Sequence, residues 1–375
     1  MDSKRLLENY DLENLTIASL GGHSALEVSL GAKKQGLRTC VVAKKGREKT
    51  YTEFLKTDEN KETGCVDEVI LVDEFSDILK PEIQKKLREL NALFVHSRYF
   101  WVYFDDFAKV ENDFNVPILG TRELLRLEER DQNPNQYDVL EAAKIRIPKI
   151  FKSAKEIDRL TLTKIPNATR TYERENFFAS SAEEWQKTIN EKLEAGQISQ
   201  EGIEKAVIEE FILGAPINFN FFYSPLSDRL ELLGTDTRRQ TNLDGWLRLP
   251  ASEQAKLTVA GIQPSHIETG HIAATVKESL LEKAFEAGSR FVETCKKYNP
   301  KGIVGPFALQ GAIETDGKKE ELVVFDVSFR MPGSPGIAAT PYSSYLFGRP
   351  VSMGERIAME VAAARMSGKL GEIVS

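Results

Sequence analysis

Short apolar runs alternate with amphipathic segments over the first 120 residues of the chain. Residues 15–20 (LTIASL) form a run short enough for a buried strand, and the helically spaced residues 25–35 end at Gly36. Further apolar runs suited to strands follow at 39–43, 66–73 and 92–97. Strands that alternate with helical segments in this way predict a parallel sheet with crossover helices.

The pattern changes after residue 121. Residues 122–145 have helical spacing, and short strand candidates then surround a charged loop at 167–175. The later elements are a β-rich stretch, an amphipathic helix and two central strands, at 207–233, 277–297, 304–313 and 322–329. The pattern therefore predicts an α/β N-terminal part followed by a larger α+β part.

Composition narrows the classes of partner and compartment. The 375 residues carry a net charge of -7 from 50 basic and 57 acidic side chains, which predicts no general attraction to nucleic acid or anionic membranes. The three cysteines form no CxxC pair, so neither a disulfide framework nor a structural zinc site is indicated. With no apolar signal-peptide core and no run near ~18 apolar residues, we expect a cytoplasmic protein without a nucleic-acid or membrane partner.

The first candidate site is the turn after the first apolar run. Gly21 and Gly22 let the backbone approach a ligand, and the helix that follows offers unpaired N–H groups to a phosphate. His23 and Ser24 would add side-chain donors. The alternative is a tight turn in which Ser24 caps the helix.

Charged residues within strand candidates give a second group. Lys164 lies in LTLTKIP, where it would either meet an anion such as a nucleotide phosphate or lie exposed on an edge strand. Glu209 and Glu210 open the apolar run EEFILGAP, where they would bind a ribose hydroxyl or an adenine amine, or simply form a solvated strand end. Asp236–Arg239 and Asn242 follow a further strand, where two adjacent arginines and a nearby asparagine suit phosphate or carboxamide recognition or simply form an exposed loop.

The C-terminal strand pair contains the most informative residue. Asp326 lies between Phe325 and Val327, and a buried mid-strand carboxylate is costly unless it is paired or binds a metal ion. A magnesium ion that bridges ATP phosphates would explain it, and an ion pair with Arg330 is the alternative. The four histidines have no metal-ligand spacing, and the spacing of His271 within its segment favours a loop.

Several segments together resemble a known family, the archaeal 5-formaminoimidazole-4-carboxamide ribonucleotide synthetases. The segments that carry the resemblance include GTRELLRLEERDQN, EEFILGAPINFNFFYSP, GIVGPFALQG and FDVSFRMPG, in this order along nearly the whole chain. The resemblance implies a Rossmann-like N-terminal domain followed by a two-lobed ATP-grasp domain. The expected domains are the Rossmann-like domain, the small lobe and the large lobe, at 1–121, 122–206 and 207–375.

The resemblance also implies an activity and its groups. The family uses ATP, Mg²⁺ and formate to formylate the amine of an aminoimidazole-carboxamide ribonucleotide through formyl phosphate, and it implies a homo-oligomer. The implied substrate-binding residues are His23, Ser24, Ser97 and Asn242. The implied ATP-binding residues are Lys164, Arg170, Glu209 and Glu210. Gln310 and Asp326 are the metal candidates, and Arg330 is the catalytic candidate.

The chain departs from the family at two of these places. The first metal glutamate is replaced by Gln310 and the second by the shorter Asp326, and the loop at 167–176 (NATRTYEREN) has no glycine. Two alternatives follow from these departures. One is a divergent ATP-grasp ligase that joins another carboxylate to an amine, and the other is a nucleotide-binding protein without catalysis.

Overall fold

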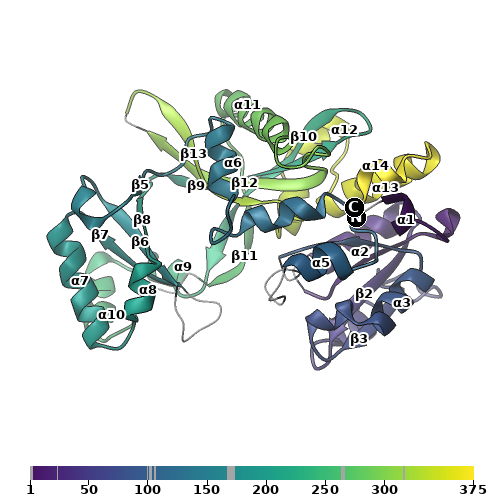
Figure 1. Cartoon of the computed structure of the whole chain (residues 1–375), viewed down its shortest axis with the longest axis horizontal. Helices are drawn as coiled ribbons and strands as arrows, with labels where there is room; N and C mark the ends of the chain where they lie inside the picture. The colour runs from purple at the N-terminus through teal and green to yellow at the C-terminus, as the bar shows by residue number, and fades with distance from the viewer. Residues whose placement is uncertain are drawn as a thin grey trace. The chain divides into compact units, whose positions relative to one another are not determined.

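The structure is a computed structural model, which describes residues 3–22, 24–98, 100, 104, 107–166, 174–262, 267–315 and 317–375. The chain divides into two units. Unit 1 contains Met1–Ile145, Pro216–Gly311 and Asp326–Ser375, and unit 2 contains Arg146–Ala215 and Ala312–Phe325. The chain crosses from one unit to the other several times, and some of these crossings fall inside a strand. Each unit is described below by itself (Figure 1).

A four-stranded parallel sheet forms the N-terminal part of unit 1, which confirms the prediction from the apolar runs. Its order is β3-β2-β1-β4, so the direction of strand addition reverses between β1 and β4. All residues of β1 and β4 are buried, as expected for parallel strands covered on both faces. The strands are β1 (Thr16–Leu20), β2 (Arg38–Lys44), β3 (Glu68–Val72) and β4 (Ala92–Val95).

Helices before and after this sheet in sequence complete unit 1. The helices before residue 145 are α1 (Ser3–Leu6), α2 (Ala25–Lys34), α3 (Pro81–Glu89), α5 (Phe107–Asp113) and α6 (Gln136–Ala142). The C-terminal ones are α12 (Tyr342–Phe347), α13 (Met353–Met366) and α14 (Leu370–Ile373). The helical segment predicted at 122–145, with a polar interruption at 130–136, consists of a 3₁₀ helix at Arg122–Glu128 followed by α6.

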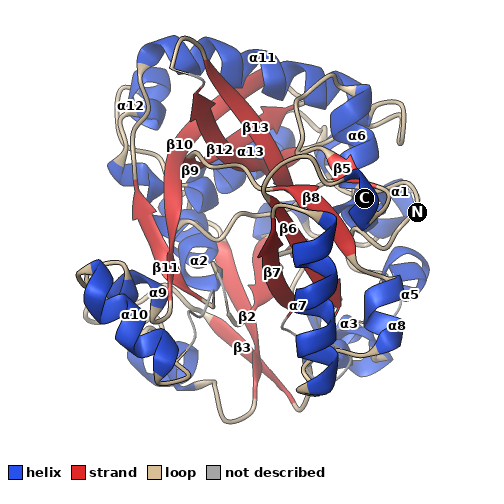
Figure 2. Cartoon of the chain, turned by 90° about the vertical axis from the view of Figure 1, so that its left-hand side faces the viewer, coloured by secondary structure: helices blue, strands red, loops and turns tan. Residues whose placement is uncertain are grey.

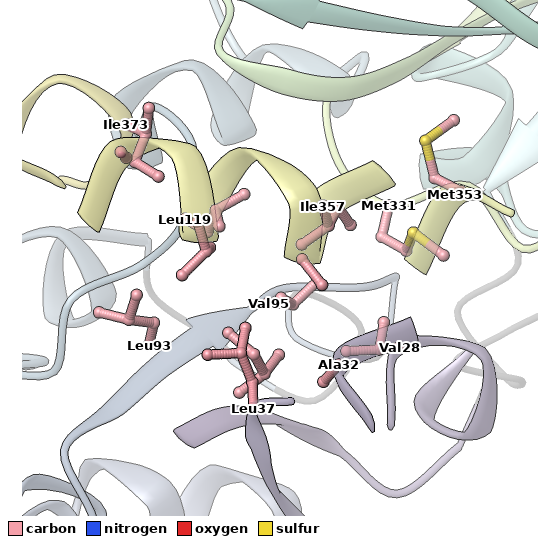
Figure 3. Close-up of a cluster of buried hydrophobic side chains, with 14 of the residues drawn as sticks. Val28, Ala32, Leu37, Leu93, Val95, Leu119, Met331, Met353, Ile357 and Ile373 are labelled. Carbon is pink, nitrogen blue, oxygen red and sulfur yellow. The ribbon is translucent and has the colours of Figure 1, made fainter. Parts of the chain in front are cut away.

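Helices α2 and α13 pack backbone to backbone. A Cβ atom added at Gly31 would lie 2.1 Å from the carbonyl carbon of Gly354, so both glycines are required at this crossing. The side chains around the crossing form a large apolar cluster in which Val28 of α2, Val95 of β4 and Ile357 of α13 meet (Figure 3). The C-terminal helix is thus part of the core that supports the N-terminal sheet.

A five-stranded sheet forms the second part of unit 1, and parts of its last two strands in sequence belong to unit 2. Its order is β11-β10-β9-β12-β13 (Figure 2). The predicted amphipathic helix is α11 (Glu278–Cys295), which packs on one face of the sheet, where Gly288 lies against Phe221 and Leu230. The strands are β9 (Ala215–Ser224), β10 (Arg229–Gln240), β11 (Glu268–Ala273), β12 (Gly305–Thr315) and β13 (Glu320–Ser328). Short helices α9 (Leu243–Trp246) and α10 (Ala251–Val259) lie between β10 and β11 in sequence.

Unit 2 contains a small antiparallel sheet of order β5-β8-β6-β7. Its core joins Ile165 and Phe177 of the sheet to Ile189 of α7. The elements are β5 (Ile150–Phe151), β6 (Thr161–Pro166), β7 (Arg174–Ala179), α7 (Ala182–Glu194), α8 (Gln200–Glu204) and β8 (Val207–Glu210). In the described part of the chain, no helix combines the length and apolar character that a membrane span requires.

The remaining helical turns are short. The 3₁₀ turns other than Arg122–Glu128 are Leu12–Asn14, Phe75–Leu79, Ala154–Glu156 and Pro335–Ala339, and one π turn lies at Thr50–Phe54.

Candidate functional site

The glycine turn after β1 is built for close backbone approach. A Cβ atom at Gly21 would lie 2.9 Å from the Tyr51 ring and 3.2 Å from the Cα of Ala43, so only glycine fits. Ser24 has a φ of 81° and donates a hydrogen bond to the Pro332 carbonyl at 3.1 Å instead of capping α2 with its side chain. Ser24 is nevertheless the N-cap residue of α2, as the alternative expected, and its carbonyl oxygen accepts a hydrogen bond from the Val28 N–H at 3.0 Å. His23 lies outside the described residues.

Ser97 lies just after β4, the strand that neighbours β1. Its hydroxyl and that of Ser19, on β1, are buried and have no hydrogen-bond partner among the described residues. Ligands of open parallel sheets bind at the carboxyl ends of the strands where the strand order reverses, and here that place is between β1 and β4. The structure thus brings Ser97 and the glycine turn to the same end of the sheet.

His96 precedes Ser97 and is fully enclosed. Burial lowers the pKa of His96 to about 4, and its Nε2 lies 3.3 Å from the Phe329 carbonyl oxygen. The imidazole is therefore neutral near pH 7 and fixes the segment that follows β4 to the end of β13.

The face of the five-stranded sheet opposite α11 is lined with polar side chains, and we call it the polar face. Alternation along each strand places these side chains together. Its members are Asn218 and Asn220 of β9, Asp236 and Arg238 of β10, His271 of β11, Gln310 of β12, and Asp326 and Ser328 of β13.

Asp236 and His271 form the buried centre of the polar face. Asp236 accepts hydrogen bonds from Asn218 at 2.9 Å and Asn220 at 2.6 Å, and it also contacts His271 Nδ1. The other ring nitrogen of His271 lies 2.8 Å from Glu268 Oε1. Burial acts to lower the pKa of His271, but hydrogen bonds to Asp236 and Glu268 outweigh it and raise the pKa to about 9. His271 is therefore an imidazolium between two carboxylates at neutral pH.

Arg238 connects this centre to the two metal candidates. Its Nη2 contacts Gln310 Oε1 and lies 3.7 Å from Asp326 Oδ2. Gln310 in turn donates a hydrogen bond to Ser328 at 2.7 Å. The structure thus brings Gln310 and Asp326 together around one guanidinium.

Asp326 is surrounded by cationic side chains. Burial acts to raise the pKa of its carboxyl, but the charges of Arg130, Arg238 and Arg98 outweigh it and lower the pKa below its ordinary value. The proposed ion pair with Arg330 is wrong, because Arg330 pairs with Glu128 at 2.8 Å. Asp326 is therefore a carboxylate at neutral pH.

The nucleotide candidates of unit 2 lie on two adjacent strands. Lys164 of β6 contacts Glu209 of β8, and since β6 lies between β8 and β7, the alternative of an exposed edge-strand lysine is wrong. Glu210 accepts hydrogen bonds from the Lys149 N–H at 3.1 Å and from Arg159 at 2.9 Å. Both glutamates are buried, so the alternative of a solvated strand end is also wrong.

The last two binding candidates are Asn242 and Arg170. Asn242 is exposed at the end of β10, with a φ of 47°, and begins α9. Arg170 lies outside the described residues. The roles of all these site residues in binding stay predictions.

Comparison with known proteins identifies the family. Residues 184–375 match the family described as "Domain of unknown function (DUF1297)", and residues 17–151 match "Protein of unknown function (DUF1246)". The chain is 38% identical over 372 residues to the 5-formaminoimidazole-4-carboxamide-1-(beta)-D-ribofuranosyl 5'-monophosphate synthetase of Methanopyrus kandleri, covering 99% of this chain and 98% of that protein. It is 39% identical over 375 residues to the protein of the same name from Methanothermobacter thermautotrophicus, covering 99% and 97%. The chain belongs to this synthetase family.

Solved structures confirm the expected fold. An IMP biosynthesis protein PurP from Thermococcus kodakaraensis superposes with a TM-score of 0.70 at 25% identity, covering 96% of this chain and 100% of that chain. The ADP complex of an N5-carboxyaminoimidazole ribonucleotide synthetase superposes with a TM-score of 0.57 at 12% identity, covering 90% and 78%. The latter likeness concerns the fold alone.

The residues of the polar face have the donor chemistry for one magnesium ion. No group of three or more His, Cys, Asp and Glu side chains in the described ranges could hold a metal ion. Magnesium, however, binds through one or two carboxylates and completes its shell with substrate phosphates and water. The Asp326 carboxylate fits this mode, whereas the Gln310 amide oxygen already accepts a hydrogen bond from Arg238 and would have to release it to bind the ion.

The sequence interpretation found part of the polar face, since Asp236–Arg239, Gln310 and Asp326 were candidates, but it missed the asparagines and the histidine. His271 was expected in a loop, but it lies in β11, where it is paired with Arg238 of β10. A signal was present in β9, because Asn218 and Asn220 interrupt an otherwise apolar run at alternate positions. Polar residues at alternate positions of a buried strand indicate a polar patch on one face of a sheet.

Proposed function

We propose that this chain is an ATP- and formate-dependent ligase that formylates the 5-amino group of 5-aminoimidazole-4-carboxamide ribonucleotide in purine biosynthesis. The observation that carries the proposal is membership of the synthetase family over the whole chain, at 38% and 39% identity to the two relatives above. The half-buried Asp326 carboxylate beside Arg238 supports it, because phosphoryl transfer needs positioned charges of this kind.

The reaction has two steps. A formate oxygen attacks the γ-phosphorus of ATP, and ADP leaves with the electrons of the broken P–O bond, which gives formyl phosphate. The amine nitrogen then attacks the formyl carbon, phosphate leaves with the electrons of the C–O bond, and the amine loses a proton. Because little covalent chemistry is required of the protein, positioning and charge neutralisation are its main contributions.

The residues divide between these tasks. Ser24, Ser97 and Asn242 would orient the ribonucleotide. Lys164, Glu209 and Glu210 would hold the ATP. Asp326 and Gln310 would hold Mg²⁺, which when bound supplies positive charge to the phosphate oxygens. Arg330, held by Glu128 at 2.8 Å, would stabilise charge near the end of β13.

Two further parts of the proposal rest on the family. We expect the protein to act in the cytoplasm and to form a homo-oligomer. Its substrates would be the ribonucleotide, formate and ATP.

The test is to incubate the purified protein with ATP, Mg²⁺, formate and the aminoimidazole-carboxamide ribonucleotide, and to measure ADP together with the product mass. We expect ADP only when all substrates are present, and a nucleotide heavier by one CO unit. Asp326→Asn should lower kcat by roughly 100-fold, whereas Asp73→Asn, on the surface, should leave it unchanged. ADP release only with other acid–amine pairs would instead support a divergent ligase, and ATP binding without turnover would support a non-catalytic protein.

A further inference from the structure

Side chains hold both backbone polar groups of Phe329, the residue that follows the end of β13. The Phe329 N–H donates a hydrogen bond to Glu128 Oε2 at 3.1 Å, and the Phe329 carbonyl oxygen lies 3.3 Å from His96 Nε2. Because a carbonyl oxygen only accepts hydrogen bonds, Nε2 carries the proton of the imidazole and donates this bond. β13 is the last strand of its sheet, and these two side chains fix the position of its end.

The His96 ring lies in a closely fitted, buried site. The residue is 3% exposed, and its ring makes a T-shaped contact with Phe100, with centroids 6.5 Å apart. A Cβ atom at Gly120 would lie 3.3 Å from His96 Cε1, so a side chain at position 120 would press on the ring. Nδ1 is buried and has no hydrogen-bond partner among the described residues, which costs stability. Packing alone therefore does not account for a histidine at this place, whereas the bond to Phe329 does.

His96 belongs to the segment that carries a predicted ribonucleotide-binding residue. It lies between β4 and Ser97, whose hydroxyl is buried at the end of the parallel sheet where the strand order reverses. Burial acts to raise the pKa of the Asp326 carboxyl, and Arg98 is one of three arginines whose charges outweigh it. Residues 96–98 are therefore linked to the end of β13 at two points, by the hydrogen bond of His96 and by the charge of Arg98.

We propose that His96 is a positioning residue that holds the ribonucleotide at the end of the parallel sheet in line with the acyl phosphate formed beside Asp326. This inference rests on the proposed function, which assigns Ser97 to the ribonucleotide and Asp326 to phosphoryl transfer. His96 acts through the backbone of its neighbour Ser97 and through the backbone of Phe329, and not by contact with a substrate. The hydrogen bond thus connects the part of the site that holds the amine to the part that makes the electrophile.

The alignment matters because formyl phosphate can react with water as well as with the amine. In the side reaction a water oxygen attacks the formyl carbon, phosphate leaves with the electrons of the C–O bond, and the water loses a proton. Formate is regenerated, so ADP is released without formylated product. A displacement on the order of 1 Å can slow attack by a positioned group by about 100-fold, and water would then compete with the amine.

Variants of His96 can separate its hydrogen bond from its packing. His96→Gln places an amide N–H at a reach similar to that of Nε2 and keeps a donor for the Phe329 carbonyl. His96→Asn is shorter by one methylene and loses this donor. His96→Phe also loses the donor but keeps a ring against Phe100, so it remains informative if His96→Asn does not fold.

Tyr10→Phe is the matched control. Tyr10 donates a hydrogen bond to the Ala92 carbonyl at 3.0 Å, at the opposite end of β4 from His96. This variant therefore also removes a side-chain hydrogen bond to the backbone of the β4 segment, but at the end away from Ser97.

The measurement is the ratio of formylated nucleotide to ADP at saturating ATP, formate and ribonucleotide. The unmodified protein should form one product for each ADP. His96→Asn and His96→Phe should lower this ratio by about 10-fold or more, whereas His96→Gln and Tyr10→Phe should keep it near that of the unmodified protein. A merely structural role would lower the amount of active protein, and with it product and ADP by the same factor, so the ratio would not change.

The outcomes separate this inference from the proposed function. If the unmodified protein formylates the ribonucleotide and the ratio is unchanged in His96→Asn and His96→Phe, only this inference is wrong. A ratio that falls equally in His96→Gln or in Tyr10→Phe would also overturn it, because the bond to Phe329 would then not be the cause. If product forms only with another acid, the proposed function is wrong, and the same ratio measured with that acid decides the inference. Without turnover of any acid, both are wrong.

Discussion

The two faces of the five-stranded sheet are built on the same strands but are held together in different ways. On the face under α11, Phe221 and Phe291 both stack on Phe307, with ring centroids 5.4 Å and 5.1 Å away. On the polar face, Asp236 and His271 are joined by an ion pair within a network of hydrogen bonds. Apolar and polar residues alternate along the same strands. One face of the sheet is therefore stabilised by apolar packing, and the other by hydrogen bonds and ion pairs.

The difference has a consequence for how each face tolerates change. Apolar packing depends mainly on volume and shape, so similar side chains can replace one another at modest cost. A buried charge that loses its partner is much more costly, because its desolvation is no longer compensated. The polar face therefore depends on the identity of each residue, and its stability depends on pH.

The largest effect is expected on the apolar face. Phe307 is completely buried between two other rings, so Phe307→Ala should lower the free energy of unfolding of unit 1 by about 3–5 kcal/mol. Urea unfolding followed by near-UV circular dichroism would measure the change. Phe307→Leu, which keeps most of the apolar volume, should cost clearly less, and equal losses for the two variants would mean that packing volume does not govern this face.

The polar face should respond to pH. The pKa of His271 is about 9 in the folded chain against an ordinary value of 6.5. A pKa raised by folding stabilises the protein fully below pH 6.5, and this stabilisation is lost as pH rises to about 9. Because the His271 side chain is only 9% exposed, the loss should be on the order of 3 kcal/mol.

Comparison with a variant isolates this contribution. Burial also raises the pKa of Glu27, to about 7, so its stabilisation is lost at lower pH, between about 4.5 and 7. Asp236→Asn removes the main partner of His271 and leaves Glu27 unchanged. The difference in unfolding free energy between the unmodified protein and this variant should therefore shrink from pH 6.5 to 9. A constant difference would show that His271 is neutral in the folded chain.

The apolar framework could be predicted from the sequence because its signals are local. The parallel sheet follows from short apolar runs separated by helical segments, and α11 follows from its own spacing. Asp326 was singled out for the same reason, since a carboxylate between apolar neighbours in one strand is visible without knowing its partners.

The polar network could not be predicted because its partners are distant in sequence. Asp236 and His271 are 35 residues apart, and Arg238 and Gln310 are 72 residues apart. Pairing of β10 with β11 brings the first pair together across a segment that contains two short helices, and no spacing rule applies to such a connection. The alternative of an ion pair between Asp326 and Arg330 was wrong for a similar reason, because the partner of Arg330, Glu128, comes from another part of the chain.

A smaller effect is expected at the edge of the polar network. Ser334 is buried, and its hydroxyl lies 3.2 Å from His271 Nδ1, the atom that also contacts Asp236. Ser334→Ala removes this contact but leaves the ion pair, so the free energy of unfolding should fall by about 1 kcal/mol. Proton NMR titration of the His271 ring should still give a raised pKa. A return to the ordinary value would mean that the serine, and not Asp236, holds the imidazolium.

The smallest effect is expected at Arg239, the neighbour of Arg238 on β10. Arg239 is exposed, and within the residues that the structure describes its side chain forms no ion pair or hydrogen bond, so Arg239→Ala should change the free energy of unfolding by less than about 0.5 kcal/mol. Arg238 contacts two residues of the polar face from the adjacent position. The two arginines differ mainly in the face of the sheet on which they lie. If Arg238→Ala and Arg239→Ala lowered the free energy of unfolding in urea equally, the position of an arginine on the polar face would not determine its contribution to stability.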